Sequence, residues 1–374
     1  MPNQSDSWPD PTFLNESDAA IWGLTPRARL ERALRRAQSG AGEAAKPGKL
    51  VFRADMVLHE SLVRALVCRP GTVLTDDRGR PVAGHGRDEA EGEIISGTIK
   101  AERMPHAGSD LVVVDAAGLT GTYDQALRRK GAPYLFSLET QSPAEIERRM
   151  YLESYKGVTD LVTKYVWPEP ALLVTRFCAG RGISPNMVTL VSFLCVVLAT
   201  WLFAVGQFGL GLVAAWAMCF LDTVDGKLAR CTLTSSKWGN VFDHGTDLIH
   251  PPFWYWAWYV GLGGAAVVDP WIFWVIIAGY ILGRGQEGLF MWQFGIEMHI
   301  WRPLDSSFRL ITARRNPNLI ILSVAVAFGA PDTGFEIVAW WTILSFLFHC
   351  VRIAQAFMAR AQGARPVSWL MDRA

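Results

Sequence analysis

The sequence predicts a membrane all-α bundle of six transmembrane helices, preceded by a small cytoplasmic α/β domain. Arg, Asp, Glu and Gly are frequent from residue 1 to about 180, whereas apolar runs with few charges dominate residues 187–358. Several of these runs approach the roughly 20 apolar residues that a helix needs to cross a bilayer. We therefore expect an α/β domain over residues 1–149, a juxtamembrane helical connector over 150–182, the membrane domain over 183–360 and a cytoplasmic tail over 361–374.

The bulk composition adds little to this division. The formal net charge of the 374 residues is +1, which gives no indication of the charge of a partner, and we expect no nucleic-acid partner. The six cysteines form no CxxC pair, so they indicate reduced thiols rather than a disulfide framework or a metal site. The polar, acidic start MPNQSDSWPDP predicts no cleavable signal peptide.

Six apolar segments are expected to be membrane helices. They cover residues 187–206, 208–221, 241–263, 271–294, 319–330 and 335–358. The second is long enough only if it continues into the charged residues that follow, and the fifth is short unless Asn316-Pro317-Asn318 begins it. A soluble helical protein is the alternative, and the length of the apolar runs disfavours it.

Lys and Arg lie on one side of these helices. The connections between helices 1 and 2, 3 and 4, and 5 and 6 contain neither residue, while the other side carries Lys227, Arg230, Lys237, Arg302, Arg309, Arg314, Arg315, Arg360, Arg365 and Arg373. Because basic loops stay on the cytoplasmic side, both termini and the 221–240 segment should be cytoplasmic. This predicts a multi-pass protein of the cell (inner) membrane.

Four aspartates stand at the junction of the second and third helices. Their pattern is D-x2-D-G-x2-A-R, eight residues, then G-x3-D-x3-D, in which the acids are Asp222, Asp225, Asp243 and Asp247. Residues three or four apart share a helix face, and a short connection makes the two helices antiparallel neighbours, so the carboxylates can converge. Converging carboxylates repel one another unless a cation joins them. Oxygen ligands indicate Mg²⁺ or Mn²⁺, with two ions per site expected.

The other residues of the pattern suit a nucleotide diphosphate. Gly226 and Gly239 allow close approach to the backbone, and Arg230 can meet a phosphate with its forked donors. Asp247 is placed to take a proton from an attacking hydroxyl. A lone D-x-x-D-G is a weak signal, common in turns and calcium loops, and Lys227 or Arg230 alone would indicate only a topological anchor. Eight positions at fixed spacing are far more specific.

The complete pattern resembles the signature of the CDP-alcohol phosphotransferase family, with every position met. The resemblance extends over about residues 183–358 and includes Ser184-Pro185-Asn186-Met-Val-Thr189 before the first helix. It implies a transferase of phospholipid biosynthesis, often a homodimer, that passes a phospho-alcohol group from a CDP-linked donor to an acceptor hydroxyl and releases CMP. By this resemblance, Asp222, Asp225, Asp243 and Asp247 bind metal and Asp247 is also the catalytic base. The implied CDP-binding residues are Asn186, Thr189, Asp222, Asp225, Gly226, Ala229, Arg230 and Gly239.

Other polar residues of the membrane segments carry less information. Arg284 and Glu287, three apart on the fourth helix, are either a mutually satisfied structural pair or candidate acceptor-binding residues. His244 and His250 flank the aspartates, and packing or hydrogen bonding is favoured over metal ligation. His349 and Arg352 are expected to be residues of the bundle interior or long side chains that reach the interface.

The first half of the chain alternates strands and helices. Residues 25–37 (TPRARLERALRRA) predict a basic amphipathic helix that either lies on anionic lipid or packs within the domain, the latter being favoured. Strands are expected at residues 50–55, 71–74 and 111–115, and a helix at 60–68, which together indicate an α/β domain. Residues 150–171 are expected to form a helical connector along the cytoplasmic interface.

This alternation weakly resembles the sugar-phosphate nucleotidyltransferases that are fused to CDP-alcohol phosphotransferases in inositol-phosphate metabolism. Asp55 follows a strand where those enzymes have a metal-binding aspartate, and residues 123–134 resemble one of their later helices. No Gly-rich phosphate loop precedes Asp55, however. We therefore expect a truncated relative without cytidylyltransferase activity, with scaffolding as its alternative role.

The identity of the donor stays open at this point. CDP-diacylglycerol with a polyol or polyol-phosphate acceptor is favoured. CDP-inositol or another CDP-polyol, with a lipid or inositol-phosphate acceptor, is the alternative, as is a bifunctional cytidylyltransferase/phosphotransferase. A non-catalytic membrane scaffold is disfavoured because the eight-position pattern is intact.

Overall fold

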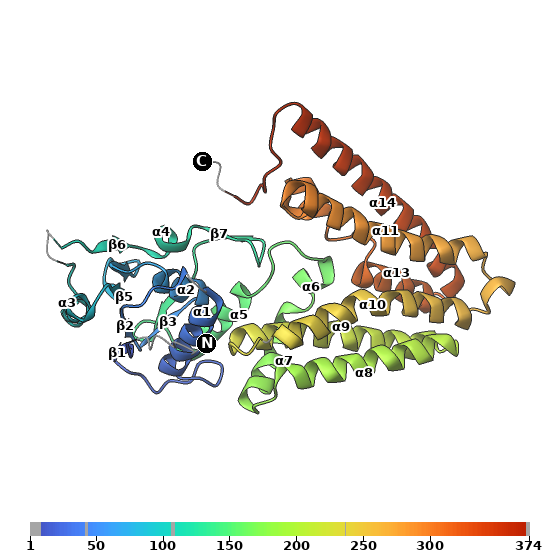
Figure 1. Cartoon of the computed structure of the whole chain (residues 1–374). Coiled ribbons are helices and arrows are strands. Elements are labelled where there is room, and N and C mark those ends of the chain that lie inside the picture. Colours follow the sequence, from blue (N-terminus) through green and yellow to red (C-terminus); the bar gives the residue numbers. More distant parts are fainter. Residues whose placement is uncertain (1–8, 42–43, 106–108, 236, 372–374) are drawn as a thin grey trace, which may run out of the picture. The chain divides into compact units, whose positions relative to one another are not determined.

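The computed structural model describes the chain except for residues 1–8, 42–43, 106–108, 236 and 372–374, and it leaves out the side chains of residues 41, 237–238, 240 and 242–244. The chain divides into two compact units (Figure 1). The first contains residues 1–124, 130–154 and 231–233, and the second contains residues 125–129, 155–230 and 234–374.

The first unit is built on a mixed five-stranded sheet with the order β1-β2-β5-β4-β6. Its strands are β1 (Thr12–Leu14), β2 (Lys49–Arg53), β4 (Thr72–Thr75), β5 (Pro81–Gly86) and β6 (Val112–Val114). The outer pairs β1–β2 and β4–β6 are parallel, and β5 runs antiparallel to both of its neighbours. Two small sheets accompany it, β3 (Met56–Leu58) with β9 (Leu135–Ser137) and β7 (Tyr123–Asp124) with β8 (Arg129–Lys130).

Helices cover both faces of this sheet, because alternate residues of each strand face opposite sides. Leu50 and Phe52 of β2 pack with α1 (Pro26–Ala41) and α2 (Glu60–Val67), whereas Val51 packs with α3 (Glu89–Lys100). The unit is completed by α4 (Ala116–Thr120) and α5 (Pro143–Glu153). The predicted α/β domain is confirmed, and the amphipathic helix packs within it. α1 also holds residues 231–233, since Arg29 Nη1 donates to the Cys231 carbonyl at 2.7 Å.

The prediction of a helix at residues 123–134 was wrong. This segment forms the short strands β7 and β8, with left-handed backbone at Arg128 (φ 49°) and Gly131 (φ 147°). The expected connector over residues 150–171 is helical but interrupted, because α5 ends at Glu153 and α6 (Leu161–Tyr165) and α7 (Pro168–Gly180) are separate helices. Asp160 caps α6 and Pro168 begins α7, so the breaks have local causes.

The second unit is helical. After α6 and α7 come α8 (Pro185–Ala204), α9 (Phe208–Cys231), α10 (Lys237–Gly261), α11 (Pro270–Phe294), α12 (Pro303–Phe308), α13 (Arg315–Ala327) and α14 (Pro331–Ala361). Short 3-10 turns lie at Gly264–Ala266 and Met298–Ile300. All six segments expected to be helices are helices. α9 does continue through the charged residues of the motif, and α13 does begin at the Asn316-Pro317-Asn318 segment.

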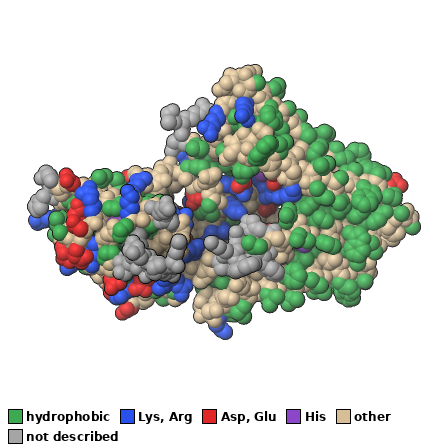
Figure 2. Space-filling view, in the orientation of Figure 1, with side chains coloured by type: hydrophobic (Ala, Val, Ile, Leu, Met, Phe, Trp, Pro, Cys, Tyr) green, Lys and Arg blue, Asp and Glu red, His purple; other side chains and the backbone are tan. Residues whose placement is uncertain are grey.

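Three helices in the described part of the chain are long and apolar enough to cross a membrane, namely α8, α9 and α14. Their outward faces are apolar: Leu194 and Trp201 on α8 are more than half exposed, as are Val213 on α9 and Leu347 on α14. Figure 2 shows hydrophobic side chains gathered over the surface of the helical unit. A surface of this kind suits lipid rather than water. The protein is therefore a membrane protein.

The helices pack closely where glycine permits it. A Cβ atom at Gly261 of α10 would lie 1.9 Å from the Phe203 carbonyl oxygen of α8, and one at Gly279 of α11 would lie 2.2 Å from Thr342 of α14. Small residues at such crossings let helix backbones approach in a membrane protein. The interior between them is filled by large side chains such as Phe203, Trp258 and Phe335.

α10 contains two consecutive prolines, Pro251 and Pro252. Neither has an N–H group, so the carbonyls of Asp247 and Leu248, four residues earlier, lose their helical donors. Tyr280 of α11 compensates, because its hydroxyl donates to the Leu248 carbonyl at 2.8 Å and lies 3.5 Å from the Asp247 carbonyl. The backbone around Asp247 thus depends on a side chain from a neighbouring helix.

Candidate functional site

The largest described cavity of the helical unit has a volume of about 440 Å³ and lies where α8, α9, α10 and the start of α13 meet. It is lined by every predicted metal-binding or CDP-binding residue whose side chain is described. These are Asn186, Thr189, Asp222, Asp225, Gly226, Ala229, Arg230, Gly239 and Asp247. The side chain of the remaining residue, Asp243, lies outside the described part of the structure.

Asp222 and Asp247 come from different helices and share one partner that the sequence did not suggest. Arg315, the first residue of α13, donates from Nη2 to Asp222 Oδ2 at 2.6 Å and from Nη1 to Asp247 Oδ1 at 2.5 Å. The side chains of Asp222 and Arg315 are less than one-fifth exposed, and that of Asp247 is 40% exposed. The guanidinium therefore bridges the two halves of the motif.

Asp225 is held differently. It is buried, and its Oδ2 atom lies 2.7 Å from the hydroxyl of Thr189 on α8. The same hydroxyl lies 3.0 Å from the Pro185 carbonyl one turn earlier. Because a hydroxyl has a single proton, and hydrogen bonds to charged acceptors are the stronger ones, we expect it to be donated to the carboxylate.

The residues present are suited to a divalent cation. The acids around the cavity offer hard carboxylate oxygens, which Mg²⁺ and Mn²⁺ prefer. A positive group, the Arg315 guanidinium, is already held between two of them. Among the described side chains no three His, Cys, Asp or Glu residues are close enough together to form a ready metal site.

Tyr155 and Lys156, from the segment before α7, line the same cavity together with Lys227 of α9. The Lys227 ammonium lies 3.0 Å from the centre of the Tyr155 ring, a cation–π contact in which the lysine is buried. Lys156 also lines the cavity; loss of hydration at its ammonium end, with Arg128 and Arg230 nearby, lowers its pKa, although the residue as a whole is exposed. Sequence reasoning missed these residues because isolated lysines at a membrane interface normally indicate topology alone.

Asp160 anchors this segment to α13. Its carboxylate accepts the backbone N–H of Thr163, which caps α6, and the side-chain amide of Asn316 at 3.0 Å. Burial would raise the pKa of Asp160, but hydrogen bonds from Thr163 and Asn316 outweigh it and hold the pKa below its usual value. Asp160 is therefore a charged structural residue at the edge of the cavity.

Arg284 and Glu287 line a separate cavity of about 20 Å³. Arg284 Nη1 lies 3.3 Å from Glu287 Oε2, and the other oxygen of Glu287 accepts from Arg314 and from His299. The pair thus belongs to a cluster of four charged or polar side chains. This arrangement favours the structural alternative, and a role in acceptor binding stays a prediction.

His250 and Arg352 have internal hydrogen-bond partners, whereas Nε2 of the buried His349 has none among the described residues. His250 Nδ1 lies 2.7 Å from the Thr246 carbonyl, which agrees with hydrogen bonding, whereas the side chain of His244 is not described. Arg352 does not reach for the interface. It is buried and makes two hydrogen bonds, of 2.5 and 2.8 Å, to Asp305.

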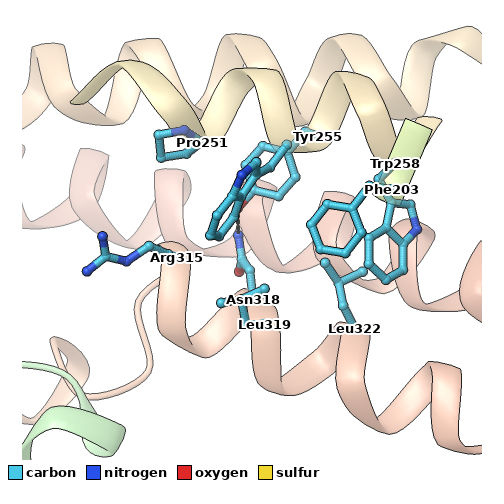
Figure 3. Close-up of a pocket in the computed structure, with 9 residues that line it drawn as sticks. Phe203, Pro251, Tyr255, Trp258, Arg315, Asn318, Leu319 and Leu322 are labelled. Atoms are coloured by element: carbon cyan, nitrogen blue, oxygen red, sulfur yellow. Dashed lines mark hydrogen bonds between the residues drawn. The ribbon is translucent and has the colours of Figure 1, made fainter. Parts of the chain in front are cut away.

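A small apolar cavity of about 10 Å³ shares Arg315 with the polar one (Figure 3). Phe203, Trp258 and Leu322 form its apolar end, and Asn318 donates to the Tyr255 hydroxyl at 2.6 Å within it. Arg315 borders both cavities, and Figure 3 shows its guanidinium directed away from the aromatic rings. α13 therefore separates an aromatic interior from the charged site.

Comparison with known proteins agrees with this geometry. Residues 182–311 match the family model described as CDP-alcohol phosphatidyltransferase. This part of the chain belongs to the CDP-alcohol phosphatidyltransferase family. Members of the family are phosphotransferases that use CDP-alcohol donors and alcohol acceptors in membranes and generally depend on a divalent metal. The protein is accordingly a membrane-bound enzyme of phospholipid biosynthesis.

Three curated proteins are similar to the chain. Archaetidylinositol phosphate synthase of Pyrococcus horikoshii is 28% identical over 189 residues, which are 50% of this chain and 91% of that protein. The bifunctional IPC transferase and DIPP synthase of Rubrobacter xylanophilus is 26% identical over 209 residues, covering 56% of this chain and 40% of that protein. Cholinephosphotransferase 1 of Xenopus laevis is 27% identical over 182 residues, covering 42% of this chain and 41% of that protein.

Among solved structures, the apo form of Mycobacterium tuberculosis phosphatidylinositol phosphate synthase is similar over 54% of this chain and 99% of that chain. The sequence identity is 16% and the TM-score is 0.38. A TM-score of this size supports no further comparison of the two folds.

Proposed function

We propose that the protein transfers a phospho-alcohol group from CDP-diacylglycerol, or a CDP-activated lipid of the same kind, to the hydroxyl of a polyol or polyol phosphate and releases CMP. The observation that supports this most strongly is the shared cavity. Residues from both halves of the motif, up to 25 positions apart in sequence, line one space of about 440 Å³ together with Asn186 and Thr189 of α8.

The residues suggest how the reaction proceeds. The hydroxyl oxygen of the acceptor forms a bond to the β-phosphorus of the donor, and the bond from that phosphorus to the bridging oxygen breaks, so that CMP leaves with the bond's electron pair. Asp247 takes the proton of the hydroxyl. Among the motif acids whose side chains are described, it is the most exposed. Arg230 is proposed to hold the donor's phosphates, and Gly226 to allow their close approach.

Asp222, Asp225, Asp243 and Asp247 are proposed to hold two divalent cations. When bound, these would neutralise the charge that develops on the phosphate oxygens. The chain's own task is then positioning, which supplies much of the rate in phosphoryl transfer.

The lipid donor is favoured over a polar one by the surroundings of the site. The cavity adjoins the apolar faces of α8 and α9, which gives the acyl chains of a donor a lipid environment. A CDP-polyol donor is the second candidate. It is favoured by the similarity to an archaetidylinositol phosphate synthase and to a bifunctional IPC transferase and DIPP synthase, whose names connect this type of domain with inositol compounds.

The remaining architecture follows from the same proposal. The six helices α8 to α11, α13 and α14 are proposed to cross the inner membrane, with both termini and the site cytoplasmic and with two copies forming a homodimer. Residues 1–149, most of which belong to the first unit, are proposed to be a degenerate nucleotidyltransferase-like domain. In support, Asp55 is bound by both ends of the Arg53 fork at 2.9 and 2.5 Å, and Arg53 also contacts Glu102 and Glu139. Because the fully buried Arg53 is held by two further acids, it is less free than Arg315 to release its aspartate to a metal.

The proposal is tested by incubating the purified full-length protein with Mg²⁺ and either CDP-diacylglycerol or CDP-inositol, each with a panel of alcohols and polyol phosphates. CMP release with one donor identifies the class, EDTA should abolish it, and added Mg²⁺ should restore it. Absence of CMP with every pair would contradict the proposal. Release of pyrophosphate from CTP would contradict the inactive first domain, and light scattering in detergent would test the dimer.

A further inference from the structure

Arg315 occupies the place where the proposed function requires metal ions. Its guanidinium is bonded at once to Asp222 on α9 and to Asp247 on α10, at 2.6 and 2.5 Å. These two carboxylates stand in opposite halves of the motif, 25 residues apart in sequence. A positive group at this point offsets the repulsion that the acids would otherwise exert on one another.

The position of Arg315 is fixed by its surroundings. It is the first residue of α13, and Nη1 also lies 3.5 Å from the sulfur of Met218 on α9. Its side chain borders the apolar cavity, in which Asn318 is tied to Tyr255, and its guanidinium is directed away from the aromatic rings (Figure 3). The planar fork of arginine can serve two carboxylates in this way, whereas the single ammonium of lysine cannot make the same pair of directed bonds.

A metal ion and this guanidinium compete for the same oxygens. A carboxylate oxygen that accepts a hydrogen bond at 2.5 Å must be released, or must turn, before it can lie about 2.1 Å from Mg²⁺. The metal ion and the guanidinium, both positively charged, also repel each other across a partly buried site, where charges are poorly screened.

We propose that Arg315 is a built-in counter-cation of the metal site: it holds Asp222 and Asp247 together in the metal-free protein, yields at least one of them when the metal binds, and thereby lowers the metal affinity. This inference rests on the proposed function, since it assumes that the motif acids bind metal. It assigns Arg315 a positioning role that acts through the aspartates. A purely structural arginine would stabilise the fold in the same way but would not oppose the metal.

The test is Mn²⁺ binding, followed by the electron paramagnetic resonance signal of free Mn²⁺, with the full-length protein freed of metal by EDTA. Arg315→Met removes the charge at similar length, and Arg360→Met, an exposed residue of α14 bonded to Gln293, is the control. We expect Arg315→Met to bind Mn²⁺ at least about tenfold more tightly, equivalent to about 1.4 kcal/mol, and Arg360→Met to match the wild type. The metal-free melting temperature of Arg315→Met should fall, and the rise in melting temperature on adding Mg²⁺ should grow.

The outcomes separate the two proposals. Unchanged or weaker Mn²⁺ binding by a folded Arg315→Met protein would overturn the role of Arg315 while leaving the metal site intact. If that variant does not fold, Arg315→Lys takes its place, because lysine keeps the charge but cannot bridge both acids. It should bind Mn²⁺ more tightly than the wild type, and weaker binding would overturn the inference. Absence of Mn²⁺ binding by the wild type itself would overturn the metal-dependent function, and the inference with it.

Discussion

The hydrogen bond between Thr189 and Asp225 gives a direct test of how the site is built. Thr189 stands on α8, and its hydroxyl lies 2.7 Å from Oδ2 of the buried Asp225 on α9. Thr189→Val replaces the hydroxyl with a methyl group of nearly the same size. The helix and its packing are preserved, while the acid loses the donor that orients it.

The expected cost follows from the type of bond. A hydrogen bond to a charged group contributes about 1.5–3 kcal/mol. Residues that orient metal ligands through such bonds typically change metal affinity by about 10–100-fold when they are replaced. We therefore expect Thr189→Val to weaken Mn²⁺ binding, and to slow CMP release at subsaturating Mg²⁺, by about 10–100-fold.

Two controls isolate this bond. Thr189→Ser keeps the hydroxyl and should stay close to the wild type. Thr200→Val removes a hydroxyl from the same helix that is bonded to a backbone carbonyl, that of Val196 at 2.8 Å, and should leave Mn²⁺ binding unchanged. If Thr189→Val binds Mn²⁺ as tightly as Thr189→Ser, the hydroxyl does not position Asp225 and the reasoning is refuted.

Three further outcomes are expected. Asp247→Asn should lower the rate of CMP release by at least about 100-fold because the proton acceptor is lost, and an undiminished rate in a folded variant would exclude Asp247 as the base. Arg352→Met should cost about 3–5 kcal/mol of unfolding free energy in detergent because it leaves Asp305 charged and unpaired in the interior, and a cost below about 1 kcal/mol would argue against that burial. Loss of hydration at the ammonium end of Lys156, with Arg128 and Arg230 nearby, lowers its pKa, so the wild type should lose this positive charge, and activity with it, as the pH rises. Lys156→Arg should stay active to higher pH, and superimposable pH profiles would contradict a role for the Lys156 charge.

The helices of the second unit were predictable because a membrane segment is recognised from its own residues. Each expected segment is a helix, and most ends lie within a few residues of the prediction. The fifth helix shows where this fails. α13 begins at Arg315, inside a charged stretch that hydropathy excludes, because Arg315 finds its partners on α9 and α10 rather than in solvent.

The candidate site was predictable as far as local spacing reaches. The motif specified the acids and glycines, and the structure brings the described ones to one cavity. Nothing in the sequence connects Arg315 with acids 93 and 68 residues earlier, or Lys227 with Tyr155. Such contacts depend on how helices pack, which spacing along a chain cannot express.

The first unit was less predictable because its signals are local and conflicting. Residues 123–134 have the apolar spacing of a helix, yet Arg128 and Gly131 adopt left-handed backbone that a helix does not allow. β5, which lies at the centre of the sheet, was not anticipated. Its sequence PVAGHG contains two glycines and a proline, and its strand conformation comes from pairing with β2 and β4.

The two prolines of α10 interrupt its backbone hydrogen bonding within a helix that runs from Lys237 to Gly261. On the C-terminal side of the prolines, Trp254 and Trp258 pack in the core of the bundle. On the N-terminal side, where Asp247 lies, the Leu248 carbonyl accepts a hydrogen bond from the Tyr280 hydroxyl. The backbone at Asp247 therefore depends on α11 as well as on its own helix. A change at Tyr280 would act on the start of the site without touching any side chain that lines the cavity.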